Sequence, residues 1–328
     1  MSAEIERKLE KIPVINWLVR ILKEIKLPAF EGLSLYDLIE MYFLGIIQGA
    51  LSTRASAISF SLFLALFPLL IFLLTLVPFL IPYVSVGNEN FDAQFFLFLE
   101  SFLPSATSDY FGEIYQQLKS QERPDLWSSI LAFITSIFLM ANGVNSIFGG
   151  FETSYHVELT RNFFRQYAYA LLVGLVLSVL LIVGAVVYIY FEFYILGYLS
   201  EFASRTGGYV LEEGEIIGAQ IGKVLFFMIL SYLTTATLYY FGTREGKEAR
   251  FFSAGALMTT LLFLLTSYLF GVYVEKFARY NELYGALGGL LILLVFIWLN
   301  SNILLLGFEL NASLNSLRKN LRKDDTNE

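Results

Sequence analysis

The chain has 328 residues, of which 56% are hydrophobic and only 16% are charged, whereas charged residues make up about a quarter of a typical soluble domain. These proportions exclude a soluble globular domain and indicate an integral membrane protein. The absence of cysteine and the single histidine exclude disulfides, thiolate chemistry, Fe–S ligation and a His-rich metal site. The formal net charge of -7 says little about orientation, because in a membrane protein the informative quantity is how Lys and Arg are distributed between the two sides of the membrane.

The N-terminal region, residues 1–54, interleaves basic and apolar side chains. This spacing predicts an amphipathic helix suited to an anionic membrane surface, and a second one is expected over residues 35–51. Charges recur every few residues and leave no uninterrupted apolar core, so we expect no cleavable signal peptide. We assign residues 1–54 to cytoplasmic or interfacial amphipathic helices.

Six apolar stretches follow, each long enough to cross the hydrocarbon core as an α-helix of about 20 residues. The first contains Ala57, Ser61 and Ala65 at four-residue intervals, and such small residues favour close packing against another helix. Pro68 in the same stretch is either a hinge or a fixed kink. The predicted spans cover about 55–81, 126–151, 167–191, 216–241, 251–274 and 283–308, within a transmembrane domain of 55–311.

The first outer loop, residues 87–125, is acidic and contains two amphipathic pieces, FDAQFFLFLESFL and SDYFGEIYQQLKS. Their apolar faces need a partner, either the spans or the outer membrane surface. Residues 312–328 form a polar cytoplasmic tail that is too polar to fold alone. The predicted fold class is therefore an all-α integral membrane protein with six transmembrane helices and amphipathic interfacial helices at the N-terminus and in the first outer loop.

Lys and Arg residues are distributed unevenly between the two sides of this arrangement. Sixteen lie in the N-terminal region, the second and fourth loops and the tail, five lie in the remaining loops, and Lys223 lies inside the fourth span. The positive-inside rule then places both termini in the cytoplasm. An even number of spans agrees with that placement.

Polar side chains within or at the ends of the spans are the candidate functional residues, because such groups are costly in lipid unless they face protein, water or a headgroup layer. Asn302 and Glu309 in the last span are seven residues apart and share one face of the helix. The candidates for binding substrate or lining a cavity are Arg54, Asn145, Lys223, Asn300, Asn302 and Glu309.

Each candidate also has a structural explanation. Glu309 is a proton or cation site, a helix-end partner for Arg54, or a carboxylate at the level of the headgroups. Arg54 either binds a substrate phosphate or carboxylate or anchors the first span, and Lys223 has the same two explanations. The asparagines either line a polar pathway or form hydrogen bonds between helices. The lone His156 lies in a loop, where we expect a solvated or interfacial side chain.

Several segments, in this order along the chain, resemble the YihY/BrkB family of bacterial inner-membrane proteins, once named as a ribonuclease BN group. They are Arg54-Ala-Ser-Ala-Ile-Ser-Phe with Leu66-Phe-Pro-Leu-Leu70, Asn145-Ser-Ile-Phe-Gly-Gly150, and Tyr284-Gly-Ala-Leu-Gly288 leading to Leu305-Leu-Gly-Phe-Glu-Leu-Asn311. The resemblance covers about residues 35–315 and implies a six-helix protein of the inner membrane. Phe308 departs from it, because the family more often has a small residue there.

The sequence contains no phosphate-binding loop, zinc-protease motif, nucleophile elbow or paired acidic nuclease motif. We therefore expect no enzymatic activity, no cofactor, no bound metal and no nucleic-acid partner, and the ribonuclease label finds no support in these residues. The first functional hypothesis is a transporter or flippase-like protein that moves an anionic or zwitterionic solute or lipid through a polar cavity faced by Arg54, Lys223, Asn302 and Glu309. The second is a non-transporting envelope protein that binds lipid or a membrane partner. The expected partners are membrane lipids and a small solute or ion, and the oligomeric state stays open.

Overall fold

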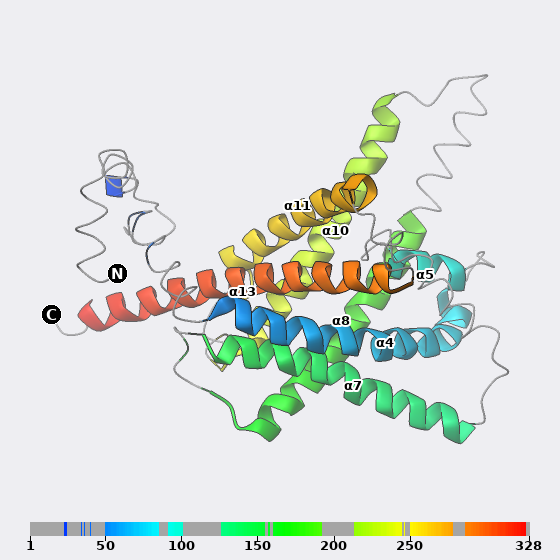
Figure 1. Ribbon diagram of the computed structural model, residues 1–328, viewed down its shortest axis with the longest axis horizontal. Helices are drawn as coiled ribbons and strands as arrows, with labels where there is room; N and C mark the ends of the chain where they lie inside the picture. The colour runs from blue at the N-terminus through cyan, green and yellow to red at the C-terminus, as the bar shows by residue number, and fades with distance from the viewer. Residues whose placement is uncertain are drawn as a thin grey trace.

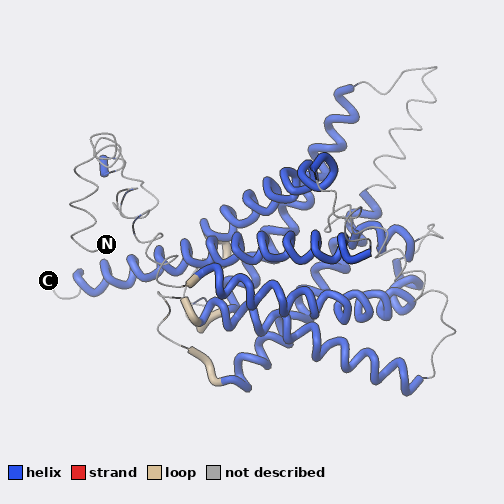
Figure 2. The backbone as a smooth tube through the Cα atoms, in the orientation of Figure 1, coloured by secondary structure: helices blue, strands red, loops and turns tan. Residues whose placement is uncertain are grey.

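The computed structural model describes residues 50–84, 91–100, 126–154, 157, 160–191, 213–244, 246, 250–277 and 286–325, with a few single positions before residue 50. This part of the chain consists of helices and the loops that join them, without a strand (Figure 2). The helices, labelled in Figure 1, are α4 (Leu51–Val84), α5 (Phe91–Glu100), α7 (Leu126–Glu152), α8 (Phe163–Phe191), α10 (Glu213–Gly242), α11 (Ala254–Phe277) and α13 (Ala286–Asp325).

Six of these helices, α4, α7, α8, α10, α11 and α13, are long and apolar enough to cross a membrane. The all-α fold class and its six spans are thus confirmed. The amphipathic helices predicted before Leu51 fall outside the described residues, apart from a few single positions, and so do the second amphipathic piece of the outer loop and His156.

α4 and α7 pack at close range because small residues lie along their contact. A Cβ atom added to Gly143 on α7 would lie 2.7 Å from the Cβ of Ala65 and 3.8 Å from the carbonyl oxygen of Ser61. One turn along, the Ser146 hydroxyl donates to the Ala57 carbonyl at 3.5 Å. The predicted stripe of small residues on α4 therefore follows its contact with α7, which is the packing that such stripes permit in membranes.

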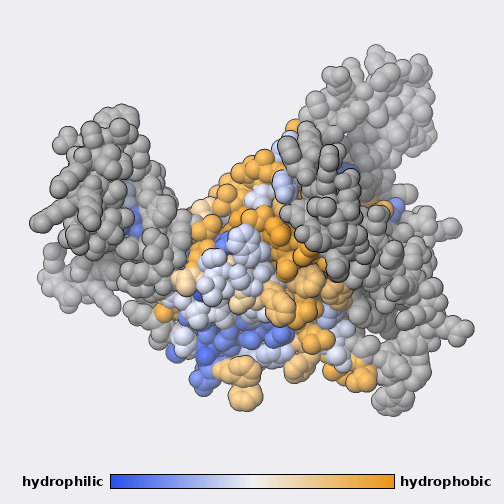
Figure 3. Space-filling view, viewed as in Figure 1, coloured by the Kyte–Doolittle hydropathy of each residue, from blue (hydrophilic) through white to orange (hydrophobic). Residues whose placement is uncertain are grey.

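The outer surface of the bundle is apolar, as lipid requires. On α11, Leu257, Leu261, Leu265 and Leu269 recur at four-residue intervals, and each is at least half exposed. Figure 3 shows apolar residues over the middle of one face, with hydrophilic residues gathered toward its lower left. An exposed apolar face of this size would be an aggregation liability in water, so the surface agrees with a helix bundle that is solvated by lipid chains.

α5 corresponds to the first amphipathic piece of the outer loop. Phe95 and Phe98 are buried, whereas Leu97 is 60% exposed. The Phe98 ring stacks with Phe227 of α10 at 6.2 Å and lies 5.6 Å from the Tyr188 ring of α8. The apolar face of α5 therefore packs on the spans, which is one of the two partners expected for this piece.

Several helices continue past the bounds expected from sequence, and α4 and α13 are the two that bear on the predictions. α4 passes through Pro68 as one helix and ends at Val84, so a hinge at Pro68 stays a prediction. α13 extends through most of the polar tail to Asp325. Extension of an existing helix gains a hydrogen bond for each residue that is fixed, without a new nucleation step. A segment that is too polar to fold alone can thus be helical as the continuation of a span.

The helix ends meet at one end of the bundle, on the left of Figure 1. There the beginning of α4 contacts the end of α7 through Arg54 and Gly150. The loop after α7 contacts the end of α10 through Arg161 and Phe241, and α13 contacts the beginning of α11 through Asn311. We call this region the polar end, because its contacts join charged and amide side chains to helix termini.

Candidate functional site

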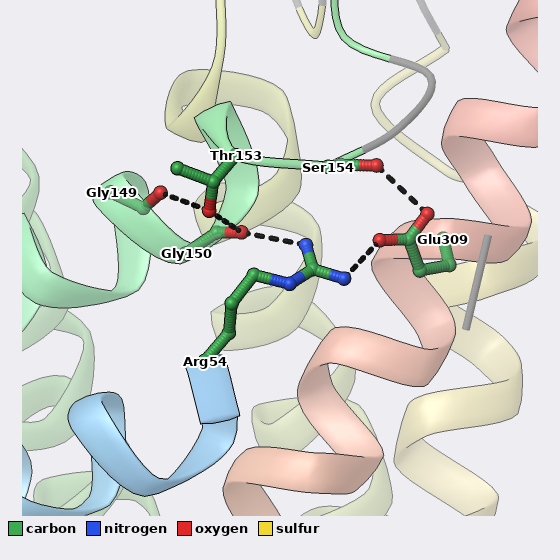
Figure 4. Close-up of polar contacts among 6 residues, drawn as sticks. All are labelled: Arg54, Gly149, Gly150, Thr153, Ser154 and Glu309. Atoms are coloured by element: carbon green, nitrogen blue, oxygen red, sulfur yellow. Dashed lines mark hydrogen bonds and ion pairs between the residues drawn. The ribbon is translucent and has the colours of Figure 1, made fainter. Parts of the chain in front are cut away.

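A buried ion pair joins the first and last spans at the polar end. Arg54 Nη2 donates to Glu309 Oε1 at 2.6 Å, and the two side chains are 8% and 0% exposed. The second carboxylate oxygen of Glu309 accepts a hydrogen bond from the Ser154 hydroxyl at 2.8 Å. Figure 4 shows that Glu309 projects from α13 toward both partners. Pairing and hydrogen bonding of this kind are what allow charges to be buried, so the helix-end partner expected as one explanation of Glu309 is present.

Arg54 also binds the C-terminal end of α7. Its Nη1 atom donates to the Gly150 carbonyl at 2.9 Å, and the Thr153 hydroxyl contacts the same carbonyl at 3.2 Å. The last carbonyls of a helix lack partners within the helix and carry a partial negative charge that favours a nearby cation. The third nitrogen of the guanidinium, Nε, is buried without a hydrogen bond among the described residues.

Arg161 does the same for α10. Its guanidinium donates to the carbonyls of Phe241 at 2.7 Å, Gly242 at 3.2 Å and Thr243 at 2.6 Å, and it lies 4.4 Å from the centre of the Tyr169 ring. Burial lowers the pKa of Arg161, while the Glu152 carboxylate and Tyr169 act in the opposite direction. The side chain remains a cation at neutral pH. It connects the loop after α7 to the end of α10.

Asn311 organises the beginning of α11. Its side-chain oxygen accepts from the Gly255 amide at 2.8 Å, and its Nδ2 donates to the Ser253 hydroxyl at 2.8 Å. Ser253 is the N-cap of α11, because its hydroxyl accepts from the Ala256 amide at 3.3 Å. The amides of the first helical turn are thereby satisfied by side chains.

Close contact between α11 and α13 depends on Gly255 and Gly307. A Cβ atom on Gly307 would collide with the Thr259 hydroxyl and would lie 2.7 Å from the Gly255 carbonyl oxygen. The same contact contains Tyr239 of α10, whose hydroxyl donates to the Leu304 carbonyl at 2.6 Å and lies 2.6 Å from the Thr259 hydroxyl. α10, α11 and α13 thus form one packed unit beside the pair of α4 and α7.

The other predicted candidates lie away from the ion pair or bond locally. Lys223 sits on α10 nineteen residues before Gly242, roughly 28 Å along the helix, with its amine 5.6 Å from the centre of the Tyr188 ring. Asn300 and Asn302 donate to the carbonyls of Phe296 and Trp298 within their own helix, at 2.8 and 2.7 Å. The side-chain oxygen of Asn145 is buried without a hydrogen bond among the described residues.

The structure therefore brings Arg54 and Glu309 together and does not join Lys223, Asn300 or Asn302 to them. Substrate binding by any of these residues stays a prediction. Sequence analysis missed Arg161 and Asn311 as organising residues. Ser253 directly before an apolar run is a recognisable helix-start signal, but nothing local in the sequence reveals that Asn311 would reach it.

A metal site was not expected, and within the described part no group of three or more His, Cys, Asp or Glu side chains could hold an ion. The arrangement at the polar end instead holds a charge pair away from water and connects α13 to α4 and the loop after α7 through it.

Comparison with known proteins identifies the family. The sequence profile of the family described as virulence factor BrkB matches residues 44–328, which confirms the resemblance found from sequence. The ribonuclease-like protein YfkH of Bacillus subtilis is 25% identical over 269 residues, covering 81% of this chain and 91% of YfkH. A UPF0761 membrane protein of Coxiella burnetii is 26% identical over 258 residues, covering 77% of this chain and 84% of the relative. No solved structure matches the chain.

Proposed function

We propose that this chain, which belongs to the virulence factor BrkB family, is a transporter or flippase-like protein for an anionic or zwitterionic solute or lipid. The chain is a multi-pass membrane protein with six spans. The observation that carries the proposal is the buried pair of Arg54 and Glu309 between α4 and α13. In this proposal the pair closes the polar end and separates when the protein opens.

The bonds of Glu309 indicate where such an opening would occur. Both of its partners, Arg54 and Ser154, lie across the boundary between α13 and the pair formed by α4 and α7. The bond from Arg54 to Gly150 stays within that pair. Movement of α13 away from α4 and α7 would therefore break the two bonds of Glu309 and leave Arg54 held at the end of α7, with its guanidinium ready for an anion.

A contact that must open and close is better formed by an ion pair than by apolar packing. Buried pairs lose much of their Coulomb gain to desolvation, so they contribute little net stability compared with apolar packing. Once water or a substrate phosphate enters, each member regains a partner. The cost of separation is then smaller than the cost of breaking the pair in a dry interior, and an anionic substrate would compete with Glu309 for Arg54.

We also propose that the protein lies in the bacterial inner membrane with both chain ends in the cytoplasm. The excess of Lys and Arg in the regions next to the polar end supports this orientation. The polar end would then face the cytoplasm. The proposal includes no enzymatic activity and no nucleic-acid partner. RNA cleavage, which the ribonuclease-like name of YfkH suggests, is tested with purified protein and labelled RNA.

The experiment uses purified protein in liposomes with fluorescent lipids and a panel of anionic solutes. The chain contains no cysteine, so introduced pairs can be crosslinked without background. Trp298 Nε1 donates to the Ser56 hydroxyl at 3.2 Å across α4 and α13, which makes Ser56→Cys with Trp298→Cys a lock between them. Ala57→Cys with Ser146→Cys, at a contact between α4 and α7, is the matched control. We expect flux above empty vesicles that the first crosslink stops and the second does not.

Folded protein that gives no flux or scrambling above empty vesicles would refute transport. Flux that continues with α4 and α13 crosslinked would leave transport in place but refute the opening between these helices.

A second function, a non-transporting envelope protein that binds lipid or a membrane partner, is favoured by one observation. Lys223, Asn300 and Asn302 do not converge on the ion pair. The same experiment separates the two functions.

A further inference from the structure

A small cavity lies along α13 at the polar end, and the residues of the ion pair do not line it. It measures about 30 Å³ and lies between Val157 of the loop after α7, the end of α10, the residues before α11, and α13. Its polar lining comes from Tyr240, Thr243, Arg250, Ser253, Asn311 and Asn315, and Phe308 and Ala312 contribute apolar surface. Space of this size admits about one small polar group, such as the oxygen atoms of an anion whose remainder stays at the open mouth.

The lining offers hydrogen-bond donors. Ser253 Oγ accepts two hydrogen bonds, from Ala256 and Asn311, so its own proton is available for an acceptor. Asn311 uses one of its two amide protons on Ser253 and has a second one. Tyr240 and Asn315 also line the cavity, and their side chains have no hydrogen bond to any described residue.

Among the described lining residues, the charge comes from Arg250. Arg250 is exposed at the cavity, and it forms no ion pair or hydrogen bond with the described residues. None of the described residues that line the cavity is acidic. A guanidinium together with hydroxyl and amide donors is the donor set that recognises phosphate groups.

Part of the lining lies between two candidate spans, where the headgroup region is expected. The span in α10 ends at Gly242, and the span in α11 begins at Ala254, so the lining residues between them border the headgroup region. Phe252, 66% exposed, stacks with Tyr232 at 5.9 Å. Exposed aromatic side chains beside a cation are typical of the membrane boundary.

We propose that this cavity is a binding site for a phosphate group, supplied either by the headgroup of an anionic phospholipid or by free phosphate. Arg250 pairs with the phosphate charge, and Ser253, Asn311 and Asn315 donate to its oxygens. The site borders α10, the residues before α11, α13 and the loop after α7, and Glu309 is not among its lining residues. Binding at this site does not require transport, so it can be measured whether or not the protein moves a substrate.

The experiment measures retention of phosphatidylglycerol by the purified full chain with native mass spectrometry, and diacylglycerol, which lacks the phosphate, is the reference lipid. Arg250→Gln removes the cation. The matched control is Arg244→Gln, which removes an exposed arginine of the same loop that does not line the cavity. Asn315→Leu removes one donor without changing the charge. Thermal unfolding checks that each variant is folded, and a second arm adds inorganic phosphate at constant ionic strength.

We expect Arg250→Gln to weaken phosphatidylglycerol binding about tenfold or more, because a hydrogen-bonded charge contributes that much, and Asn315→Leu to weaken it about threefold. Arg244→Gln should bind as the unchanged chain does. Displacement of the lipid by inorganic phosphate identifies a site for free phosphate, whereas binding of the lipid alone identifies a headgroup site, and both results support the proposal. Equal losses for Arg250→Gln and Arg244→Gln, or no preference over diacylglycerol, would overturn it.

Discussion

Removing one member of the buried ion pair should destabilise the protein much more than removing both. Arg54→Met leaves the Glu309 carboxylate, 0% exposed, with only the Ser154 hydroxyl as a described partner. Orphaning one charge of a buried pair costs about 3–5 kcal/mol. Glu309→Leu leaves the guanidinium with the Gly150 carbonyl, and a similar loss of about 3–5 kcal/mol is expected.

The double variant Arg54→Met with Glu309→Leu should behave differently. It removes both charges and replaces them with apolar side chains of similar size, a change that is often neutral or stabilising by about 1–4 kcal/mol. Against this, the Ser154 hydroxyl loses its bond to Glu309 and the Gly150 carbonyl loses Arg54 but keeps the Thr153 hydroxyl, and each lost hydrogen bond costs about 0.5–1.5 kcal/mol. The two contributions nearly cancel, so we expect the double variant to lie within about 2 kcal/mol of the unchanged protein.

The assay is unfolding in mixed detergent micelles, followed by tryptophan fluorescence and helical circular dichroism. All four proteins of the double-mutant cycle are measured under the same conditions, so the coupling between the two residues is obtained directly. Single variants that lose less than about 1 kcal/mol would behave like an exposed pair, and the reasoning from a dry buried pair would fail. A double variant as unstable as the sum of the singles would also contradict it.

Two further predictions concern the close contact between α11 and α13 and the binding of Arg161 to the end of α10. Gly307→Ala places a methyl group against the Thr259 hydroxyl and a carbonyl oxygen, so it should cost about 1–3 kcal/mol in the same unfolding assay. Gly271→Ala on α11 meets nothing within 4 Å and should be neutral or stabilising by up to about 1 kcal/mol; equal effects would show that the helices are not in close contact. Arg161→Lys loses the planar fork that spans three carbonyls, and we expect a loss of about 2 kcal/mol. Arg165→Lys, at an exposed arginine of α8, should change stability by less than about 0.5 kcal/mol; a similar loss for both would rule out the carbonyl contacts as the cause.

The spans could be predicted from sequence because each is a long apolar run between charged segments. Their arrangement could not, because lipid chains are as apolar as leucine and the outer face of a span resembles its inner face. α11 illustrates this. Leu257 and Leu261 point outward, while Thr259 on the same helix lies fully buried against Gly307. Only the small and polar residues distinguish the two faces, and their partners lie on other helices.

The candidate site shows the same limit. Arg54 and Glu309 could be recognised as candidates because both are charged residues near the ends of spans, and their pairing was one of the explanations considered. Arg161 looked like any loop arginine, since the carbonyls that it binds lie about eighty residues later in the chain. Carbonyl oxygens belong to every residue, so the sequence carries no signal for a side chain that binds them.

One turn of α13 connects the helices that meet at the polar end. The Phe308 ring stacks on Phe151 of α7 at 4.2 Å, Glu309 pairs with Arg54 of α4, and Asn311 binds the beginning of α11. A shift of this turn by even 1 Å would disturb an aromatic stack, a charge pair and a helix cap together. Packed contacts of this kind have discrete arrangements and do not deform continuously. The polar end should therefore open fully or stay closed, and a phosphate bound against Phe308 and Asn311 would favour whichever arrangement preserves its cavity.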